Sequence, residues 1–288
     1  MISEFNQKVV VITYAAGELG RAYSEYFLHR GARLVLHDGD QTALLALRKD
    51  LGNHENIILS SSQDMAVADA AKIFIENVID CCAGVDVLIN NTPPHTIGAL
   101  NGVSSADALS ALNGHLLTTV LMTQAVLEHM RACGTGSIIS TASAAGAFGA
   151  AGQAIFSAAC AGVVGFIRSL SLELEATNIK VNSIAPMTAS DHDSYVVGPD
   201  PLLDRSLYDP STVAPVVAYL ASEDCQLKGQ FLSVTGGRVA HIFTSTVAGH
   251  FIHGEDHTQV GANLTAILAT NYPLIPESAA DELLMIDV

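Results

Sequence analysis

Short runs of apolar residues alternate along the chain with longer segments in which apolar residues recur every three or four positions. Each run is nearly continuous, which is typical of a parallel strand covered by helices on both faces. The intervening segments are long enough for crossover helices. Seven runs are predicted to be strands: Val9–Tyr14, Ala32–Asp38, Asn56–Ser62, Val85–Asn91, Ser137–Ser143, Ile179–Pro186 and Gln230–Gly237.

This alternation predicts a Rossmann-like α/β fold, with a doubly wound, parallel, seven-stranded sheet and helices on both of its faces. Residues 187–209 are rich in Asp, Ser, Pro and Gly and are expected to form a long loop. We expect one domain over residues 1–237. Residues 238–288 are expected to be a C-terminal extension that packs on the same domain or on a partner subunit.

Composition narrows the classes of partner. The formal net charge of −16 argues against binding to nucleic acid and to an anionic membrane surface. The five cysteines are odd in number and lack metal-ligand spacing, which favours a reducing compartment. The first residues, MISEFNQK, are polar and unlike a signal peptide. A cytoplasmic location is therefore expected.

Three motifs carry a resemblance. They are VVVITYAAGELGRAY from Val9, VDVLINN from Val85 and GQAIFSAACAGVVGF from Gly152. In this order and spacing the chain resembles the short-chain dehydrogenase/reductase superfamily over nearly its whole length. With RAYSEYF, VLEHM and IAP, it resembles most the (3R)-hydroxyacyl-CoA dehydrogenase branch.

The resemblance places Phe156 and Cys160 where the superfamily has its catalytic tyrosine and lysine. The tyrosine transfers the alcohol proton, and the lysine lowers the pKa of the phenol. Phe156 has no ionisable oxygen, and Cys160 carries no positive charge, so the apparatus for proton transfer is expected to be lost. Ser143, thirteen residues before Phe156, and His115 stand at further vestigial catalytic positions. Cys160 is interpreted as a packed residue, with a nucleophilic thiol as the alternative.

The glycine-rich turn also departs from the pattern TGxxxGxG. Tyr14 puts a ring where the tight turn has a glycine, and Glu18 puts a carboxylate near the place of a diphosphate, although Gly20 is kept. Glu18 is alternatively, and preferably, a first-turn residue favoured by the helix dipole. We therefore expect no cofactor to be bound by this chain.

Some cofactor positions survive in the resemblance. Asp38 stands where NAD-using members hold the adenosine ribose, and Asp64 lies near the adenine position. Asn90 is a degenerate cofactor position, because Asn90-Asn91 is followed by Thr92-Pro93-Pro94 in place of the family's Ala-Gly. The preferred interpretations are nevertheless a solvated strand-end carboxylate for Asp38 and a strand-end cap for Ser143.

One histidine-rich segment, HFIHGEDH, is a candidate metal site. His250, His253 and His257 lie close together in sequence with Glu255 and Asp256. A solvated surface segment is the preferred interpretation, and no metal is expected.

With its chemistry lost, the chain is expected to be a pseudoenzyme, that is, a non-catalytic subunit. The resemblance implies assembly through two long helices, roughly 107–133 and 153–176, with an intact paralogue that binds NAD. The expected product is a hetero-oligomer, a tetramer in the family, that oxidises a hydroxyacyl-CoA in a β-oxidation-like pathway. The two-subunit dehydrogenase that oxidises 2-[hydroxy(phenyl)methyl]succinyl-CoA is the precedent, and this chain resembles a candidate for its inactive subunit.

Two alternatives stay open. The chain is a stand-alone ligand-binding or regulatory protein, which predicts a homo-oligomer stabilised by a ligand. Otherwise it is an active oxidoreductase with displaced catalytic groups, such as His115 or Tyr195, which predicts that the isolated chain binds NAD.

Overall fold

The structure is a computed structural model that describes residues 4–93, 98–188, 208–247, 249, 260, 263–271, 273–279 and 281. Two sequence hypotheses lie outside these ranges: the catalytic role of Tyr195 and the histidine segment 250–257. Most of the predicted loop over 187–209 also lies outside them. The chain divides into two compact units, Met1–His241 and Ile242–Val288.

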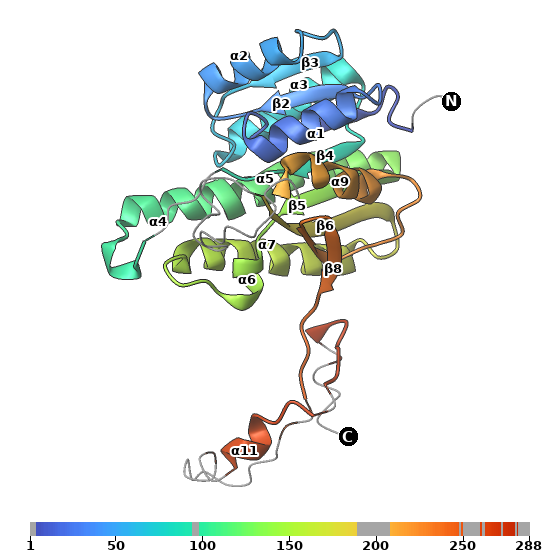
Figure 1. Cartoon of the computed structure of the whole chain (residues 1–288). Coiled ribbons are helices and arrows are strands. Elements are labelled where there is room, and N and C mark those ends of the chain that lie inside the picture. Colours follow the sequence, from blue (N-terminus) through green and yellow to red (C-terminus); the bar gives the residue numbers. More distant parts are fainter. Residues whose placement is uncertain are drawn as a thin grey trace. The chain divides into compact units, whose positions relative to one another are not determined.

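The first unit is built on an eight-stranded sheet with the order β3-β2-β1-β4-β5-β6-β7-β8 (Figure 1). Neighbouring strands from β3 to β7 are parallel. All four residues of β1 are buried, as expected for a strand covered on both faces. The strands are β1 (Val9–Ile12), β2 (Arg33–His37), β3 (Ile57–Ser61), β4 (Val87–Asn90), β5 (Thr135–Thr141), β6 (Asn178–Met187), β7 (Phe231–Thr235) and β8 (Arg238–Ile242).

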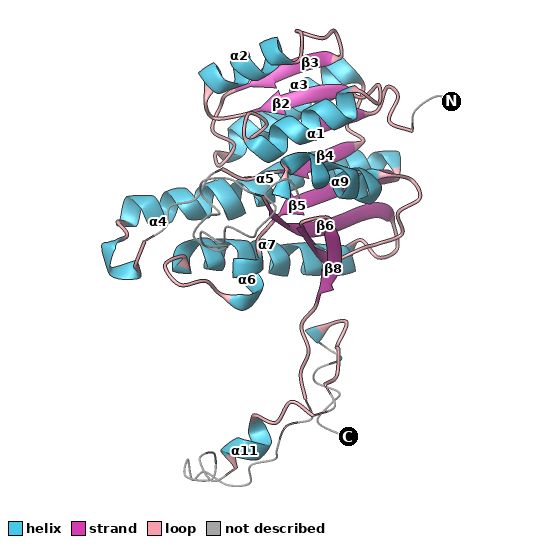
Figure 2. Ribbon diagram, in the orientation of Figure 1, coloured by secondary structure: helices cyan, strands magenta, loops and turns pink. Residues whose placement is uncertain are grey.

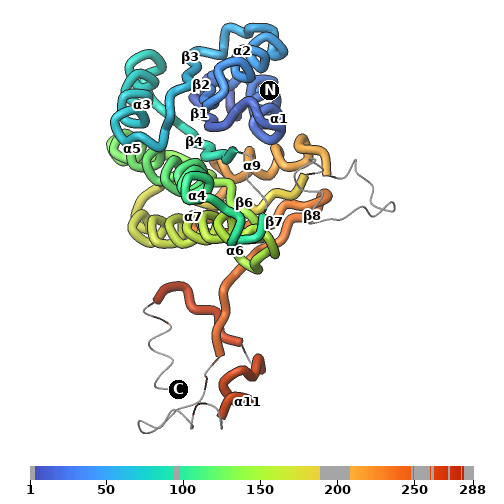
Figure 3. Tube along the Cα trace, turned by 90° about the vertical axis from the view of Figure 1, so that its left-hand side faces the viewer, coloured from blue at the N-terminus to red at the C-terminus, as the bar shows by residue number. Residues whose placement is uncertain are grey.

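Helices connect the parallel strands and cover both faces of the sheet (Figures 2 and 3). Helices α1, α2 and α9 lie on one face, and α3, α5 and α7 lie on the other. The helices are α1 (Glu18–Leu28), α2 (Gln41–Asp50), α3 (Ala68–Cys82), α4 (Ser105–Leu112), α5 (Thr118–Cys133), α6 (Ala144–Phe148), α7 (Ala154–Glu173), α9 (Ala214–Ala221) and α11 (Leu264–Ile267). Short 3₁₀ turns occur at η1 (Leu100–Gly102) and η4 (Pro210–Thr212).

The predicted doubly wound α/β fold is therefore confirmed, but the predicted number of strands is wrong. Gly236 and Gly237, at the expected end of the seventh strand, have φ values of 56° and 77° and form a tight turn. The chain then continues into β8, so the sheet extends beyond residue 237. Most of β8 is exposed at the sheet edge, so its sequence lacks the continuous apolar run that revealed the other strands.

Helices α4 and α5 are joined through a π-helical turn, η2 (Asn113–Leu117). Such turns widen a helix locally and are frequent at functional sites. Gly162 of α7 lies against this turn, since a Cβ added to it would come within 2.8 Å of Leu116. The π-turn thus connects α4 to α5 and packs against α7.

Among the described residues, only α7 is long and apolar enough to cross a membrane, judged by length and composition alone. Its most hydrophobic window has a mean hydropathy of 1.7. A core helix of a soluble protein passes the same test, and the fully buried side chains of α7 include Val163 and Ile167.

The second unit contains little regular structure in its described part. Thr246 and Leu274 form an antiparallel bridge through two backbone hydrogen bonds of 2.9 and 2.7 Å. Helix α11 has four residues. Among its described residues, the large apolar side chains that are exposed are Phe243, Val260, Leu264, Leu268, Leu274 and Ile275.

Candidate functional site

The strand order reverses direction between β1 and β4. In open α/β sheets, ligands bind outside the carboxyl ends of the strands at such a switch point. Two segments meet there: the turn after β1 (residues 13–20) and the residues after β4 (residues 91–93). We call these two segments the switch-point region.

Tyr14 stands at the first position after Thr13 in the glycine-rich turn. Its φ is 46°, which lies in the left-handed region that glycine adopts freely and tyrosine rarely does. Its ring lies edge-to-face against the ring of His37 on β2, with centroids 5.7 Å apart and an interplanar angle of 82°. The tyrosine thus keeps the backbone conformation of a glycine while filling the region with a side chain.

The other end of the Tyr14 side chain reaches the π-turn. A Cβ added to Gly114 would lie 3.4 Å from the hydroxyl oxygen of Tyr14 and 2.8 Å from Cγ of Pro93. Burial raises the pKa of Tyr14, the side chain of Thr118 opposes that rise, and the nearby charges of Asp64 and Asp38 add to it. The phenol therefore stays protonated in the neutral pH range.

The turn itself is held by Asp38, which is only 8% exposed. One carboxylate oxygen accepts a hydrogen bond from the backbone N–H of Ala16 at 2.9 Å, and the other accepts one from Asp40 N–H at 3.0 Å. The interpretation of Asp38 as a solvated carboxylate is wrong, because both oxygens face backbone donors. Its carboxylate ties β2 to the turn after β1.

Gly20 and Glu18 occupy different environments. A Cβ on Gly20 would come within 2.4 Å of the carbonyl oxygen of Tyr14, so only glycine lets α1 approach the turn so closely. Glu18 is exposed in the first turn of α1, where the helix dipole favours a carboxylate. Asp64 is also exposed and accepts a hydrogen bond from Ala66 N–H at 2.9 Å.

The two asparagines after β4 serve packing. Asn90 is fully buried and donates to the hydroxyls of Thr123 on α5 and Ser140 on β5, at 3.0 and 3.3 Å. The amide of Asn90 thus links β4 to α5 and β5. Asn91 donates to the carbonyl of Tyr14 at 3.2 Å and accepts from Thr141 at 3.2 Å.

At the catalytic positions, the structure brings Phe156 and His115 together. Their rings are edge-to-face, with centroids 5.0 Å apart and an interplanar angle of 71°. Both residues are buried, at 8% and 1% exposed. Ser143 lies at the end of β5 and caps α6, where its hydroxyl accepts a hydrogen bond from Ala145 N–H at 3.2 Å.

Cys160 is 1% exposed and lies beneath α6. A Cβ on Gly146 would come within 2.8 Å of the Cβ of Cys160, so the two helices approach closely at this point. Burial raises the pKa of the Cys160 thiol to about 12. A neutral, buried thiol is a poor nucleophile, which argues against the alternative of a reactive Cys160.

These side chains do not fit a dinucleotide cofactor. The turn where the backbone would approach a diphosphate carries Tyr14 in place of a glycine, and the ring of Tyr14 fills space beside His37 and Gly114. His37, Thr118 and Gly114 were missed by sequence reasoning. The glycine of the motif Asn-Gly-His was the only available signal, because their importance depends on contacts between distant segments.

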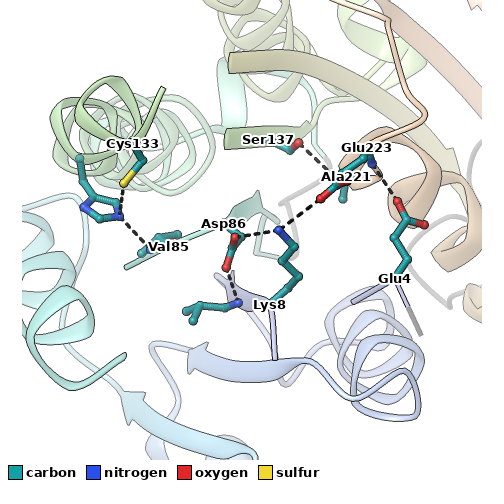
Figure 4. A network of polar contacts seen from close by, with 10 residues as sticks. Glu4, Lys8, Val85, Asp86, Cys133, Ser137, Ala221 and Glu223 are labelled. Carbon is teal, nitrogen blue, oxygen red and sulfur yellow. Dashed lines mark hydrogen bonds and ion pairs between the residues drawn. The ribbon is translucent and has the colours of Figure 1, made fainter. Parts of the chain in front are cut away.

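A cavity of about 290 Å³ lies at the opposite edge of the sheet, at the amino-terminal ends of the strands. Figure 4 shows the polar contacts in its wall. Lys8 pairs with Asp86 at 3.3 Å and with Glu223 at 3.4 Å, and Val85 N–H donates to His129 at 3.2 Å.

Two further cations of this cavity serve helix ends. Arg33 donates to the carbonyl of Cys82 at the end of α3 at 3.1 Å, and Lys180 donates to the carbonyl of Ser222 after α9. Cations at helix C-termini stabilise the exposed carbonyls. The charged groups of this cavity are therefore accounted for by packing. Among the described residues, no group of three or more His, Cys, Asp or Glu is placed to hold a metal ion.

Comparison with known proteins identifies the family. The model of the short chain dehydrogenase family matches residues 8–194. The chain belongs to this family. Its sheet order and the position of its glycine-rich turn are those of a short-chain dehydrogenase, while Phe156 and Cys160 depart from the catalytic pattern that the resemblance implies.

Two curated relatives in this family are informative. The peroxisomal multifunctional enzyme A of Dictyostelium discoideum is 30% identical over 98% of this chain and 64% of its own length. The (2S)-[(R)-hydroxy(phenyl)methyl]succinyl-CoA dehydrogenase subunit BbsD of Thauera aromatica is 32% identical over 80% of this chain and 96% of its own length. The chain spans 36% and 29% of the matched peroxisomal enzymes of Mus musculus and Saccharomyces cerevisiae. The homology to hydroxyacyl-CoA dehydrogenases thus concerns one part of those longer proteins.

Solved structures share the fold. A short chain dehydrogenase from Mycobacterium avium is 23% identical, with a TM-score of 0.80 over 92% of this chain and 95% of the other. The NAD+-bound xylitol dehydrogenase is also 23% identical, with a TM-score of 0.71 over 81% of this chain and 99% of the other.

Proposed function

We propose that this chain is a non-catalytic subunit of a cytoplasmic, hetero-oligomeric, NAD-dependent hydroxyacyl-CoA dehydrogenase. It stabilises or completes an active paralogous subunit, which alone binds NAD. The complex oxidises a hydroxyacyl-CoA thioester in a β-oxidation-like pathway. The observation that carries this proposal is the replacement of the catalytic pair by Phe156 and Cys160, which are only 8% and 1% exposed.

The chemistry of the family supports the loss of activity. Alcohol oxidation by hydride transfer needs a group that removes the hydroxyl proton, and NAD in the family supplies the hydride acceptor. Phe156 packs edge-to-face with His115 and has no phenol oxygen, and Cys160 is a neutral thiol beneath α6. The described residues at these positions pack together, and they provide neither the base nor the cation that activates it.

The relatives support the substrate class and the assembly. One of them is named as a subunit of a hydroxyacyl-CoA-type dehydrogenase, and it matches this chain over 96% of its length. A chain that has lost its catalytic pair and retains the fold is suited to a role in such a multi-subunit enzyme. We propose the acyl-CoA class of substrate by analogy with these relatives. Activity assays of the complex with different hydroxyacyl-CoA thioesters would identify the acyl group.

Helix α7 offers a surface for the partner. The exposed residues of this helix include a run of small ones, Ala158, Ala161 and Gly165. A Cβ added to Gly165 would meet no atom of the chain within 4 Å. A second helix can approach such a stripe closely, as small residues allow at helix–helix contacts.

The first experiment is native mass spectrometry of the untagged protein isolated from its own cells. We expect the mass of a complex with an intact dehydrogenase subunit, with NAD bound once per partner subunit. A pure homo-oligomer would contradict the proposal and favour a stand-alone ligand-binding protein. NAD on the isolated chain would instead favour an active enzyme with displaced catalytic groups.

A matched pair of variants tests the surface. Gly165→Arg adds a side chain in open space, so it should leave the fold intact while abolishing assembly with the partner. Leu45→Arg adds the same charge on α2 at a position that is 59% exposed, and should assemble normally. Assembly of Gly165→Arg at wild-type levels would show that this face of α7 is not the contact.

A further inference from the structure

We infer that the side chain of Tyr14 fills the space at the switch-point region that the adenosine half of a dinucleotide would occupy. In that place the side chain holds the surrounding segments together. Tyr14 does this within the chain itself and does not require the partner subunit. Its ring joins segments that a cofactor normally bridges, in a chain whose residues do not fit that cofactor.

The Tyr14 side chain spans both halves of the doubly wound sheet. On one side its ring meets His37, whose own ring continues to Phe74 of α3, with centroids 6.2 Å apart. On the other side its hydroxyl lies over Gly114, next to the ring of Pro93. Contacts therefore run from β2, through the turn after β1, to the π-turn that precedes α5.

The position of the ring corresponds to the adenosine end. In dinucleotide-binding folds, an acid after the second strand holds the ribose hydroxyls. In this chain Asp38 holds that position, and the charges of Asp38 and Asp64 are both close enough to Tyr14 to raise its pKa. His37 donates a hydrogen bond from Nε2 to the carbonyl of Gln63 at 2.8 Å, since a carbonyl can only accept. This hydrogen bond fixes the orientation of the His37 ring, which lies edge-to-face with the ring of Tyr14.

The backbone of Tyr14 is also fixed from two directions. Its carbonyl accepts from Asn91 at 3.2 Å and lies against Gly20, where a Cβ would be 2.4 Å away. A non-glycine residue at φ 46° is strained, and such a conformation persists only where the surroundings determine it. The contacts of the carbonyl and of the ring together supply that determination, so the ring has a structural task and is more than a replacement that blocks a site.

Hydrogen–deuterium exchange of the full chain tests the inference with three variants. Tyr14→Asn removes the ring while keeping a residue that tolerates positive φ. Tyr14→Phe keeps the ring. Gln7→Asn is the matched control, because Gln7 has a φ of 64° and lies outside the switch-point region. We expect amides in segments 91–92 and 113–119 to exchange about tenfold faster in Tyr14→Asn, and near wild-type rates in the other two variants.

A second arm uses adenosine 5′-monophosphate at millimolar concentration as the probe. We expect no change of exchange in the wild type, because the ring occupies the site, and slower exchange of the same segments in Tyr14→Asn. Unchanged exchange in Tyr14→Asn, or protection of the wild type by the nucleotide, would overturn the inference. Protection of the wild type by the nucleotide would overturn the inference even if Tyr14→Asn fails to fold. Neither arm depends on the partner, so this result is separable from that of native mass spectrometry.

Discussion

Removal of the Asp38 carboxylate should destabilise the chain, although the resemblance presents this residue as a ligand of ribose. Its two oxygens accept hydrogen bonds of 2.9 and 3.0 Å from backbone N–H groups of Ala16 and Asp40. Hydrogen bonds to charged groups contribute about 1.5–3 kcal/mol each, and buried donors left without a partner add a penalty. We therefore expect Asp38→Ala to lower the free energy of unfolding by about 2–4 kcal/mol.

Two further variants sharpen this measurement. Asp38→Asn keeps one acceptor oxygen and loses the charge, so it should cost about half as much, roughly 1–2 kcal/mol. Asp64→Ala is the control: its carboxylate also accepts from a backbone N–H two residues later, but it is exposed. A solvated group exchanges its partner for water, so the cost should stay below about 1 kcal/mol.

Urea unfolding followed by circular dichroism gives these values, with the midpoint and the m-value fitted separately. In thermal unfolding, a loss of this size lowers the Tm by about 2–4 °C for each kcal/mol in a domain of this size. Equal midpoints for wild type and Asp38→Ala would refute the structural role of the carboxylate. An Asp64→Ala effect as large as that of Asp38→Ala would show that burial does not distinguish the two acids.

Three other measurements test the site. The double variant Phe156→Tyr with Cys160→Lys should form no NADH from a hydroxyacyl-CoA, as measured by NADH absorbance. It should also have a lower Tm in a thermal melt, because burying an ammonium group at a 1% exposed position costs free energy. At pH 8, an alkylating reagent should modify the exposed thiols of Cys81 and Cys133 and leave Cys160 unmodified, because burial raises the pKa of Cys160 to about 12. Peptide mass spectrometry measures this, and rapid labelling of Cys160 would contradict its burial. Burial lowers the pKa of His37 below its ordinary value of about 6.5, so the imidazole is protonated at higher pH in the unfolded chain than in the folded chain. The free energy of unfolding should therefore fall as pH drops below about 6.5. Urea midpoints of His37→Gln should depend less on pH over this range, and the same pH dependence in wild type and variant would exclude His37 as the cause.

The parallel core was predictable from the sequence because its strands are buried on both faces. Such strands are apolar at every position, as the four residues of β1 are, and the spacing between the apolar runs requires crossover helices. Strand β8 was missed for the opposite reason. Its residues Arg238 and His241 are exposed at an edge, and the glycine pair before it signals a turn without saying whether pairing resumes.

Side-chain roles at the site were less predictable, since they depend on which backbone groups come near. Asn90 and Asn91 are neighbours in sequence, yet the first bonds into the sheet and the second bonds across to Tyr14. Alternation along a strand predicts that they point to opposite faces, but only the assembled sheet supplies their partners. Asp38 was likewise open between ribose ligand and solvated acid, and the structure shows a buried carboxylate that accepts hydrogen bonds from the backbone N–H groups of Ala16 and Asp40.

The departures from the family pattern share one physical character. Tyr14 and Phe156 each place an aromatic ring against a histidine, at centroid distances of 5.7 and 5.0 Å, and Cys160 places a small apolar group between two helices. Catalytic sites usually hold polar groups in strained or poorly packed positions, and replacing them tends to stabilise the fold. A chain freed from catalysis can fill these positions with packing contacts. Restoring Tyr and Lys at positions 156 and 160 without opening position 14 should therefore cost stability and return no activity.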